Sequence, residues 1–346
     1  MAAKLVAIFN ILFNHNTTYG DEAPAHRVGE WEANIGFYQA IELIPNSLLY
    51  KKQSEFQSIE VHQSKFYGKV LMLDDVLQLT ERDADSYNEM MAHIPMFQHT
   101  NPKRVLIIGG GDGYALAEVL KHPSVEHVDH VDLDEEVIAT CEIHFPQWAT
   151  GWKDPRVKLH IGDGAKFLDK VPEQSYDVII QDSSDPFEVE EDGTITPLPS
   201  GALYEEAHFC ALKQVLTEDG ILMIQAESFN IPSSLDGISQ WRHKMTNCGF
   251  ARTRYGSILT SSYPTGQIGF LLAETNPSSA TSREVIQERY DQLVEETTST
   301  PTTYYHPPLQ DSCFDLPLWV HNSVYTTTAT AIPPVAPKDI MTKEEL

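Results

Sequence analysis

The stretch that decides the fold is Val105-Leu-Ile-Ile-Gly-Gly-Gly-Asp-Gly-Tyr-Ala-Leu-Ala-Glu-Val-Leu120. It opens with a short apolar run that ends in glycines, which is typical of a buried parallel strand leading into a tight turn. We expect a helix directly after the turn, over residues 115–121. A strand, a glycine-rich turn and a helix in this order are typical of a domain that binds a nucleotide.

Strands and helices continue to alternate along the chain beyond this stretch. We expect a strand over 127–133 and a helix over 135–144. Further strands are expected over 157–161, 178–180, 221–224 and 268–273, and a last helix over 282–296. Alternation of this kind predicts a doubly wound α/β domain built on a mostly parallel sheet.

The residues before the boundary at Asn101-Pro102 have a different pattern. Short β-like runs over 56–61, 69–73 and 76–79 are separated by turn-prone residues and predict a small antiparallel meander. A helix is expected over 86–97. The predicted organisation is an N-terminal arm (1–30), a small β domain (31–98), a Rossmann-like catalytic domain with a C-terminal helix (99–325) and a disordered Pro/Thr-rich tail (326–346).

Composition excludes several classes of protein. The 346 residues carry a formal charge of −26, which argues against nucleic acid as a partner, because phosphate binding needs a basic face. The acidity fits a cationic ligand, although it also simply aids solubility. No stretch approaches the ~20 apolar residues of a membrane span. The four cysteines form no CxxC pair and no zinc spacing, so we expect reduced thiols in a cytoplasmic protein without a metal.

The glycine turn carries the first candidate site residues. Gly109 and Gly111 would let the backbone approach a nucleoside closely. Asp112 places a negative charge where the pyrophosphate of a dinucleotide would lie, which disfavours NAD and favours a cationic adenosyl ligand such as a sulfonium. Asp132 ends the second strand, where a carboxylate can accept hydrogen bonds from ribose hydroxyls. The alternative for Asp132 is a solvated surface carboxylate.

Two more acidic motifs follow later strands. Asp163 lies in Gly162-Asp-Gly164, where it could accept from the adenine amino group or simply form a turn. Asp182-Ser-Ser-Asp-Pro186 comes after the apolar run that ends at Ile180. Because ligands bind beyond the carboxyl ends of parallel strands, Asp182 and Asp185 could hold a diamine and remove a proton from it. A turn before proline is the alternative.

These residues resemble the spermidine synthase family. The resemblance covers residues 31–325 and lies in six blocks, namely 74–83, 86–90, 105–113, 162–164, 182–186 and 262–270. It implies a Rossmann-like sheet of the S-adenosylmethionine-dependent methyltransferase type, preceded by a small antiparallel β domain, and a homodimer. It also implies transfer of an aminopropyl group from decarboxylated S-adenosylmethionine, a co-substrate, to putrescine, giving spermidine and methylthioadenosine. No further cofactor is implied.

The resemblance assigns a role to each matching position. Asp182 is the implied base, assisted by Tyr87 and Asp185, which also hold the amine. Trp31 and Tyr263 would line the acceptor channel. The implied donor-binding residues are Gln57, Gln78, Asp112, Asp132 and Asp163, with Gln78 close to the reacting centre.

Four departures from the family pattern leave the acceptor open. Tyr114 stands where a third glycine is usual and would narrow the donor pocket, and Asn88 stands where Gln is usual. Asp132 replaces a common Glu. The segment 187–201 is longer and more acidic than the family's loop, and its glycines and prolines predict a loop rather than a regular element. We expect this loop to be either a lid over both cations or a surface insertion.

Three other functions compete with spermidine synthesis. The same reaction on spermidine would give spermine or thermospermine. A putrescine N-methyltransferase would have to bind the carboxylate of S-adenosylmethionine, which Asp112 would repel. A catalytically inactive partner subunit is disfavoured because Asp182, Asp185, Tyr87 and Tyr263 are all present.

Overall fold

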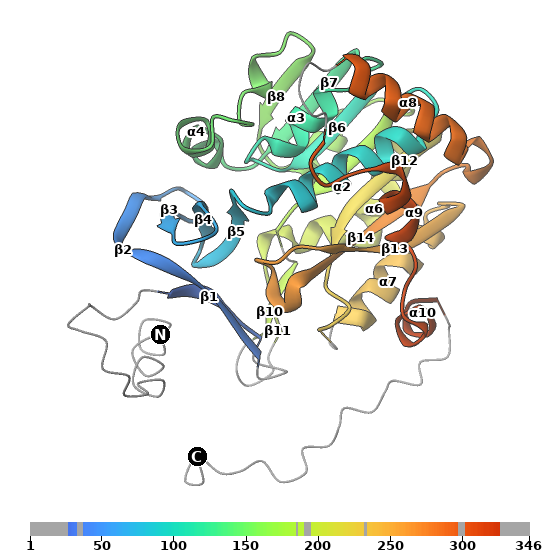
Figure 1. Cartoon of the computed structure of the whole chain (residues 1–346). Helices are drawn as coiled ribbons and strands as arrows, with labels where there is room; N and C mark the ends of the chain where they lie inside the picture. The colour runs from blue at the N-terminus through green and yellow to red at the C-terminus, as the bar shows by residue number, and fades with distance from the viewer. Residues whose placement is uncertain are drawn as a thin grey trace, which may run out of the picture.

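The computed structural model describes residues 27–32, 37–184, 186–189, 195–231, 234–296 and 302–325. Figure 1 shows a small antiparallel sheet, in blue, beside a larger α/β unit. This is the fold class that the sequence predicts. The tail expected over 326–346 and residues 1–26 of the expected arm lie outside the described residues.

The small sheet comprises five strands in sequential order, all antiparallel. They are β1 (Arg27–Glu32), β2 (Phe37–Gln53), β3 (Ser58–Ser64), β4 (Lys69–Leu73) and β5 (Val76–Thr80). The last three match the predicted meander. The sequence did not predict β1 and β2, and β1 begins inside the segment assigned to the arm. Pairing with a neighbour stabilises such strands, and a single sequence does not display that pairing.

The larger sheet has seven strands. They are β6 (Arg104–Gly109), β7 (His127–Asp132), β8 (Val157–Ile161), β9 (Tyr176–Asp182), β12 (Leu216–Ala226), β13 (Arg252–Leu259) and β14 (Gln267–Glu274). Their order is β13-β14-β12-β9-β6-β7-β8, and the five from β12 to β8 are parallel. The antiparallel strand β13 was not predicted. Because β6 and β9 are neighbours, the ends of both strands meet at one edge of the sheet.

Helices cover both faces of this sheet, which explains its continuous apolar runs. Val105 and Ile107 of β6 pack on one face against α2 (Ala84–Gln98), α3 (Tyr114–Leu120) and α8 (Arg283–Glu296). Leu106 and Ile108 pack on the other face against α6 (Glu206–Val215), α7 (Ser234–Asn247) and α10 (Leu318–Tyr325). The other α-helices of the described residues are α4 (Glu135–His144), α5 (Gly164–Leu168) and α9 (Pro307–Ser312). No helix in the described ranges is both long and apolar enough to cross a membrane.

Helix α2 belongs with the larger sheet by its packing. Met90, Met91 and Ile94 are fully buried in the core that includes β6. The sequence boundary at residues 98/99 assigns this helix to the small domain instead. The long apolar surface of the helix needs a broad sheet face to cover it, and the larger sheet supplies that face.

A third core joins the small sheet to the α/β unit. Ile59 and Val61 of β3 pack with the ring of Tyr114, which stacks on Trp148 at a centroid distance of 4.6 Å. The hydroxyl of Tyr114 donates to Asp85. The expectation that Tyr114 narrows the donor pocket is therefore not supported, because its ring fills the core between the two sheets.

The segment over 187–201 contains regular structure, which corrects the prediction of a loop. Strands β10 (Phe187–Val189) and β11 (Ile195–Pro197) pair antiparallel, and a 3₁₀ helix η3 (Pro199–Tyr204) follows. The aromatic and β-branched residues of β10 and β11 favour strands. The nearby glycines and prolines favour turns, and the prediction of a loop gave them more weight. Residues 190–194 lie outside the described residues, so the role of a lid stays a sequence-based prediction.

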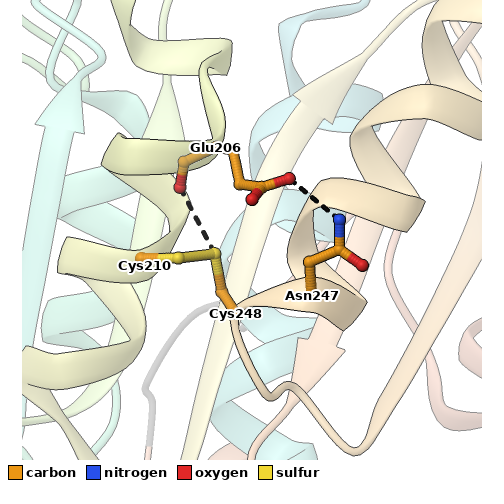
Figure 2. The surroundings of a disulfide bond; sticks show 4 residues. All are labelled: Glu206, Cys210, Asn247 and Cys248. Carbon is orange, nitrogen blue, oxygen red and sulfur yellow. Dashed lines mark hydrogen bonds between the residues drawn. A yellow bond between two sulfur atoms is a disulfide. The ribbon is translucent and has the colours of Figure 1, made fainter.

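The cysteines also differ from expectation. Cys210 of α6 and Cys248, directly after α7, form a disulfide with a Cα–Cα distance of 4.8 Å (Figure 2). Cys141 and Cys313 are buried free thiols. The prediction of four reduced thiols is thus wrong for the first pair. Their separation of 38 residues hid the pairing, which arises because α6 and α7 pack side by side.

Candidate active site

The glycine turn after β6 packs directly on the end of β9. The N–H of Gly110 donates to the carbonyl of Asp182 at 2.8 Å. Gly109 has φ +80, and a Cβ there would lie 2.0 Å from that same carbonyl oxygen. Only glycine allows this backbone conformation and this close approach without strain. The turn therefore fixes where the Asp182 side chain begins.

Asp182 is paired with a tyrosine from another part of the chain. Tyr87 of α2 donates its hydroxyl to Asp182 Oδ1 at 2.6 Å. Burial raises the pKa of Asp182, and the hydrogen bond from Tyr87 partly offsets that rise. Burial, followed by the charge of Asp182, raises the pKa of Tyr87 well above its ordinary value. Tyr87 thus stays a neutral donor, and its hydrogen bond uses Oδ1 of Asp182.

Two further carboxylates lie near Asp182. Burial, reinforced by the charge of Asp182, raises the pKa of Asp112 to about 7. Burial also raises the pKa of Asp132 to about 7, with smaller contributions from the charges of Asp134 and Asp182. Gly111 lies against Asp132, since a Cβ at Gly111 would come within 2.8 Å of Asp132 Oδ2. Such a cluster of carboxylates favours a cationic ligand.

Asp163 occupies the N-terminus of the short helix α5. Its side chain accepts from the N–H groups of Ala165 and Lys166 at 2.9 and 3.3 Å. Burial would raise the pKa of Asp163, but hydrogen bonds from Lys166 and Ala165 outweigh it and lower the pKa. The turn-forming role considered for Asp163 is therefore present. Asp163 lies two residues after the end of β8, the strand that pairs with the strand of Asp132.

Gln57 reaches the larger sheet through a residue that the sequence analysis missed. Its side-chain amide donates to Asp134 Oδ2 at 3.0 Å, and the hydroxyl of Ser54 donates to the same oxygen at 2.6 Å. Asp134 is buried and its other oxygen caps α4. The sequence did offer one indication that Asp134 belongs to the site, since it lies two residues after Asp132 at the same strand end.

A second missed residue, Asp83, holds the loop that carries Tyr263. Asp83 Oδ2 accepts from the Ser262 N–H at 2.7 Å and from the Ser261 hydroxyl at 2.8 Å, and Asp83 Oδ1 accepts from the Ser262 hydroxyl at 3.0 Å. Asp83 immediately precedes α2, the helix of Tyr87. The loop and the helix are therefore fixed to each other, and Tyr263 packs against the same core as Tyr87.

One expected site residue, Gln78, is not hydrogen-bonded to the carboxylates, and the side chains of two others, Trp31 and Asp185, lie outside the described residues. Gln78 is exposed on β5, and in the described ranges no hydrogen bond connects it to Asp112, Asp132 or Asp182. Trp31 lies on β1, in register with Tyr38 of β2. Asp185 lies outside the described residues. A search of the described residues finds no group of three or more His, Cys, Asp and Glu side chains that could hold a metal ion.

Two family models match the chain. The spermine/spermidine synthase domain matches residues 84–283, and the spermidine synthase tetramerisation domain matches residues 31–81. The first spans α2 and the larger sheet, and the second covers the small sheet from Trp31.

Named relatives agree with these models. Spermidine synthase 2 of Hyoscyamus niger is 37% identical over 281 residues, which are 81% of this chain and 87% of the relative. Spermine synthase of Arabidopsis thaliana is 38% identical over 296 residues, which are 84% of this chain and 78% of the relative.

Solved structures agree as well. A spermidine synthase in complex with the transition-state analogue AdoDATO superposes with a TM-score of 0.76 at 29% identity, over 89% of this chain and 98% of that one. Spermidine synthase from Thermotoga maritima gives a TM-score of 0.74 at 28% identity, over 90% and 98%. The resemblance and the fold class inferred from the sequence are thereby confirmed, and the chain belongs to the spermine/spermidine synthase family, whose members are aminopropyltransferases.

Proposed function

We propose that this enzyme moves the aminopropyl group of decarboxylated S-adenosylmethionine to putrescine, giving spermidine and methylthioadenosine. The observation that carries the proposal is the hydrogen bond from Tyr87 to Asp182 at the carboxyl ends of β6 and β9, next to Asp112. A carboxylate cluster at this point suits two cationic reactants, a sulfonium and an amine.

The proposed reaction is a displacement at carbon. The amine nitrogen attacks the aminopropyl carbon bonded to the sulfonium, the new C–N bond forms, and the C–S bond breaks to release neutral methylthioadenosine. A protonated amine has no lone pair and, like lysine, holds its proton with a pKa of about 10.4. Asp182 takes that proton, a role that typically contributes roughly 10²–10⁴ in rate. Its raised pKa makes it a stronger base than an ordinary carboxylate.

The donor side of the site uses the strand ends. We assign the ribose to Asp132, the sulfonium region to Asp112 and the adenine amino group to Asp163. Gly109 and Gly111 allow the backbone to approach the nucleoside. Gln57 supports this side because it is fixed through Asp134, close to Asp132. Gln78 is assigned to the reacting centre on the family resemblance alone.

The acceptor side is assigned to Tyr87, Asp185, Tyr263 and Trp31. Tyr87 directs Asp182 through its hydrogen bond. Tyr263 is supported by the contacts of Asp83, which fix its loop against the helix of Tyr87. Asp185 and Trp31 rest on the family resemblance.

Spermidine is the second candidate acceptor, since a relative that is 38% identical is named spermine synthase. The purified protein should be incubated with decarboxylated S-adenosylmethionine and, in turn, putrescine, cadaverine, spermidine or agmatine. Mass spectrometry of the products then identifies the acceptor. We expect spermidine from putrescine, with Asp182→Asn as the inactive control. If spermidine is the only acceptor that gives a product, the enzyme is a spermine or thermospermine synthase. Formation of methylated putrescine from S-adenosylmethionine would overturn the proposal.

We further propose a homodimer in the cytoplasm, with the domain boundary before α2. Self-association is supported by the match to a tetramerisation domain and by exposed Ile44, Leu48, Leu49 and Phe66 on the small sheet. Light scattering on the purified protein would measure the assembly. The Cys210–Cys248 disulfide is an observation against a cytoplasmic location, because cytosolic thiols are usually kept reduced.

A further inference from the structure

The disulfide between Cys210 and Cys248 is accessible from solvent. Cys210 is exposed and Cys248 is half-buried, whereas the free thiols Cys141 and Cys313 are buried. Both bonded cysteines line a surface hollow of about 330 Å³ that is open to solvent and also includes Lys213. A thiol reagent can therefore reach this sulfur pair while the fold stays intact.

The disulfide lies on the helix that follows the active-site segment. Helix α6 is preceded by η3, which ends the stretch that begins after Asp182. His208 of α6 shares a hydrogen bond of 2.8 Å with Gln181 Oε1, and the Gln181 amide donates to the Leu203 carbonyl at 3.2 Å. Gln181 directly precedes Asp182 in β9. The start of α6 is thus fixed to the strand that presents the proposed base.

Helix α7 holds the same stretch from its other side. Lys244 donates to the Tyr204 carbonyl at 3.0 Å and pairs with Glu205. The rings of Trp241 and Tyr204 lie 4.6 Å apart. All of these contacts are noncovalent, and the disulfide is the one covalent bond between α6 and the residue that follows α7 in the described part of the chain.

We propose that Cys210–Cys248 is a reversible thiol–disulfide exchange site for a dithiol reductant, and that its redox state sets how firmly the η3–α6 stretch is anchored beside Asp182. Disulfides in a cytosolic protein are usually transient or redox-sensing rather than permanent staples. The consequence for turnover rests on the proposed function. The exchange itself does not.

The exchange balances with a dithiol as the reductant. One thiolate of the dithiol attacks Sγ of the exposed Cys210, a mixed disulfide forms, and Cys248 leaves as a thiolate that takes a proton from solvent. The second thiol of the reagent then attacks its own sulfur in the mixed disulfide and releases Cys210. The dithiol loses two electrons and becomes a cyclic disulfide, and the protein ends with two thiols.

The surroundings of Cys248 suit it as the leaving sulfur. The carbonyl oxygen of Glu206 lies 3.3 Å from Cys248 Sγ (Figure 2). In the disulfide this sulfur has no proton to donate, but the thiol formed by reduction can donate to that carbonyl. The side chain of Asn247 donates to Glu206 Oε2 at 2.9 Å, and this hydrogen bond keeps Glu206 next to the end of α7. The reduced form therefore has a hydrogen-bond acceptor already in position.

The first test maps the thiols of the folded protein. The full chain is treated with iodoacetamide without denaturant, with or without dithiothreitol, and the labelled cysteines are identified by peptide mass spectrometry. We expect Cys210 and Cys248 to be labelled only after dithiothreitol, with Cys141 and Cys313 protected in both samples. Removal of dithiothreitol in air should restore protection. Labelling without reductant, or protection after it, would overturn the exchange site.

The second test measures the consequence. Reduced wild type should be cleaved faster by a protease between Asp182 and Glu206, and turnover should fall by at least about fivefold, the lower end of ordinary coupling between sites. Reoxidation should restore both. The Cys210→Ser/Cys248→Ser double variant should have the cleavage rate and turnover of reduced wild type, and dithiothreitol should change neither. Unchanged cleavage and turnover after complete reduction would refute the anchoring role. If the enzyme forms no spermidine but labelling and cleavage respond as expected, the proposed function fails while the redox site stands.

Discussion

The donor side and the acceptor side of the candidate site are built in different ways. Asp132 ends a parallel strand of the larger sheet, and Asp112 and Asp163 follow two others, so the sheet alone brings all three to the same edge. Tyr87 and Tyr263 lie on a helix and a loop that are far apart in the sequence. They share one region because the Asp83 side chain connects them, across a separation of 179 residues in the case of Ser262.

This difference suggests how the family can keep one donor and vary the acceptor. Changing the donor side requires a change at the end of a buried strand, where little can move without disturbing the core. Changing the acceptor side requires only a change in a loop or in its anchor, and loops tolerate substitution and insertion. The segment over 187–201, which departs from the family pattern, follows Asp182 closely in the sequence, and we expect it to belong to that variable side.

The largest expected effect is at the residue that both sides share. Asp182→Asn keeps the size of the side chain and removes the base, so turnover should fall by at least about 10²-fold. Affinity for methylthioadenosine should stay within about twofold, because no proton is transferred in that binding step. Steady-state kinetics and calorimetric titration measure the two quantities. Turnover near the wild-type rate would remove Asp182 from the role of base.

A donor-side substitution should separate the two sides. Asp132→Ala should weaken methylthioadenosine binding by roughly tenfold to a hundredfold, the loss expected for a hydrogen bond to a charged group. The KM for putrescine should change little, since the ribose belongs to the donor alone. Asp129→Ala, on the same strand β7, is a matched control. Equal weakening of both substrates would show that the two sides are not independent.

Donor binding should depend on pH. The pKa of Asp132 is raised to about 7, so the carboxylate that we propose as the acceptor for the ribose hydroxyls is protonated in acid. Affinity for methylthioadenosine should fall as pH drops through 7, by about tenfold for each unit well below the pKa. Asp132→Asn should bind weakly and show a flatter pH profile. A wild-type affinity that is constant between pH 5 and 8 would contradict the assignment.

The same pKa shift has a consequence for stability with a definite sign. Burial raises the pKa of Asp132 in the folded protein, so folding stabilises the protonated form. The contribution of this group to the free energy of unfolding is fully present below its unfolded pKa and is lost as pH rises through about 7. Asp132→Asn should therefore gain thermal stability relative to wild type at pH 8 and less at pH 5. Binding and stability are opposed at this residue.

Sequence reasoning found the carboxylates at the strand ends more fully than the residues that anchor the two sides. Asp112, Asp132 and Asp182 could be located because each follows an apolar run that ends a strand, and strand ends meet by rule. Asp134 and Asp83 were missed because their function depends on partners that are remote in sequence, such as Gln57 and Ser262. Local patterns carry no information on such contacts.

The fold shows the same limit. Buried strands such as β6 and β9 were predicted because both of their faces are apolar. β1 and β2 do not have this apolar pattern on both faces. They pair with each other, and this pairing cannot be seen in the sequence. The disulfide was missed for a related reason, because only the packing of α6 on α7 brings Cys210 next to Cys248.

The smallest expected effect tests the anchor of the acceptor side. Asp83→Ala removes three hydrogen bonds to Ser261 and Ser262, so the loop of Tyr263 should lose its fixed position relative to α2. Hydrogen bonds to charged groups contribute about 1.5–3 kcal/mol each when buried, but exposed Ser261 lowers the total here. We expect the KM for putrescine to rise by about threefold to tenfold, with methylthioadenosine affinity unchanged.

Asp83→Asn is the matched variant, since its amide oxygen can still accept from the Ser262 N–H, and it should recover much of the wild-type KM. A general loss of stability would instead lower the amount of active enzyme and leave KM alone. Thermal unfolding of both variants, followed alongside the kinetics, separates these outcomes. If Asp83→Ala weakens the binding of methylthioadenosine as much as that of putrescine, the two sides are coupled through α2. The division between a rigid donor side and an adjustable acceptor side is then wrong.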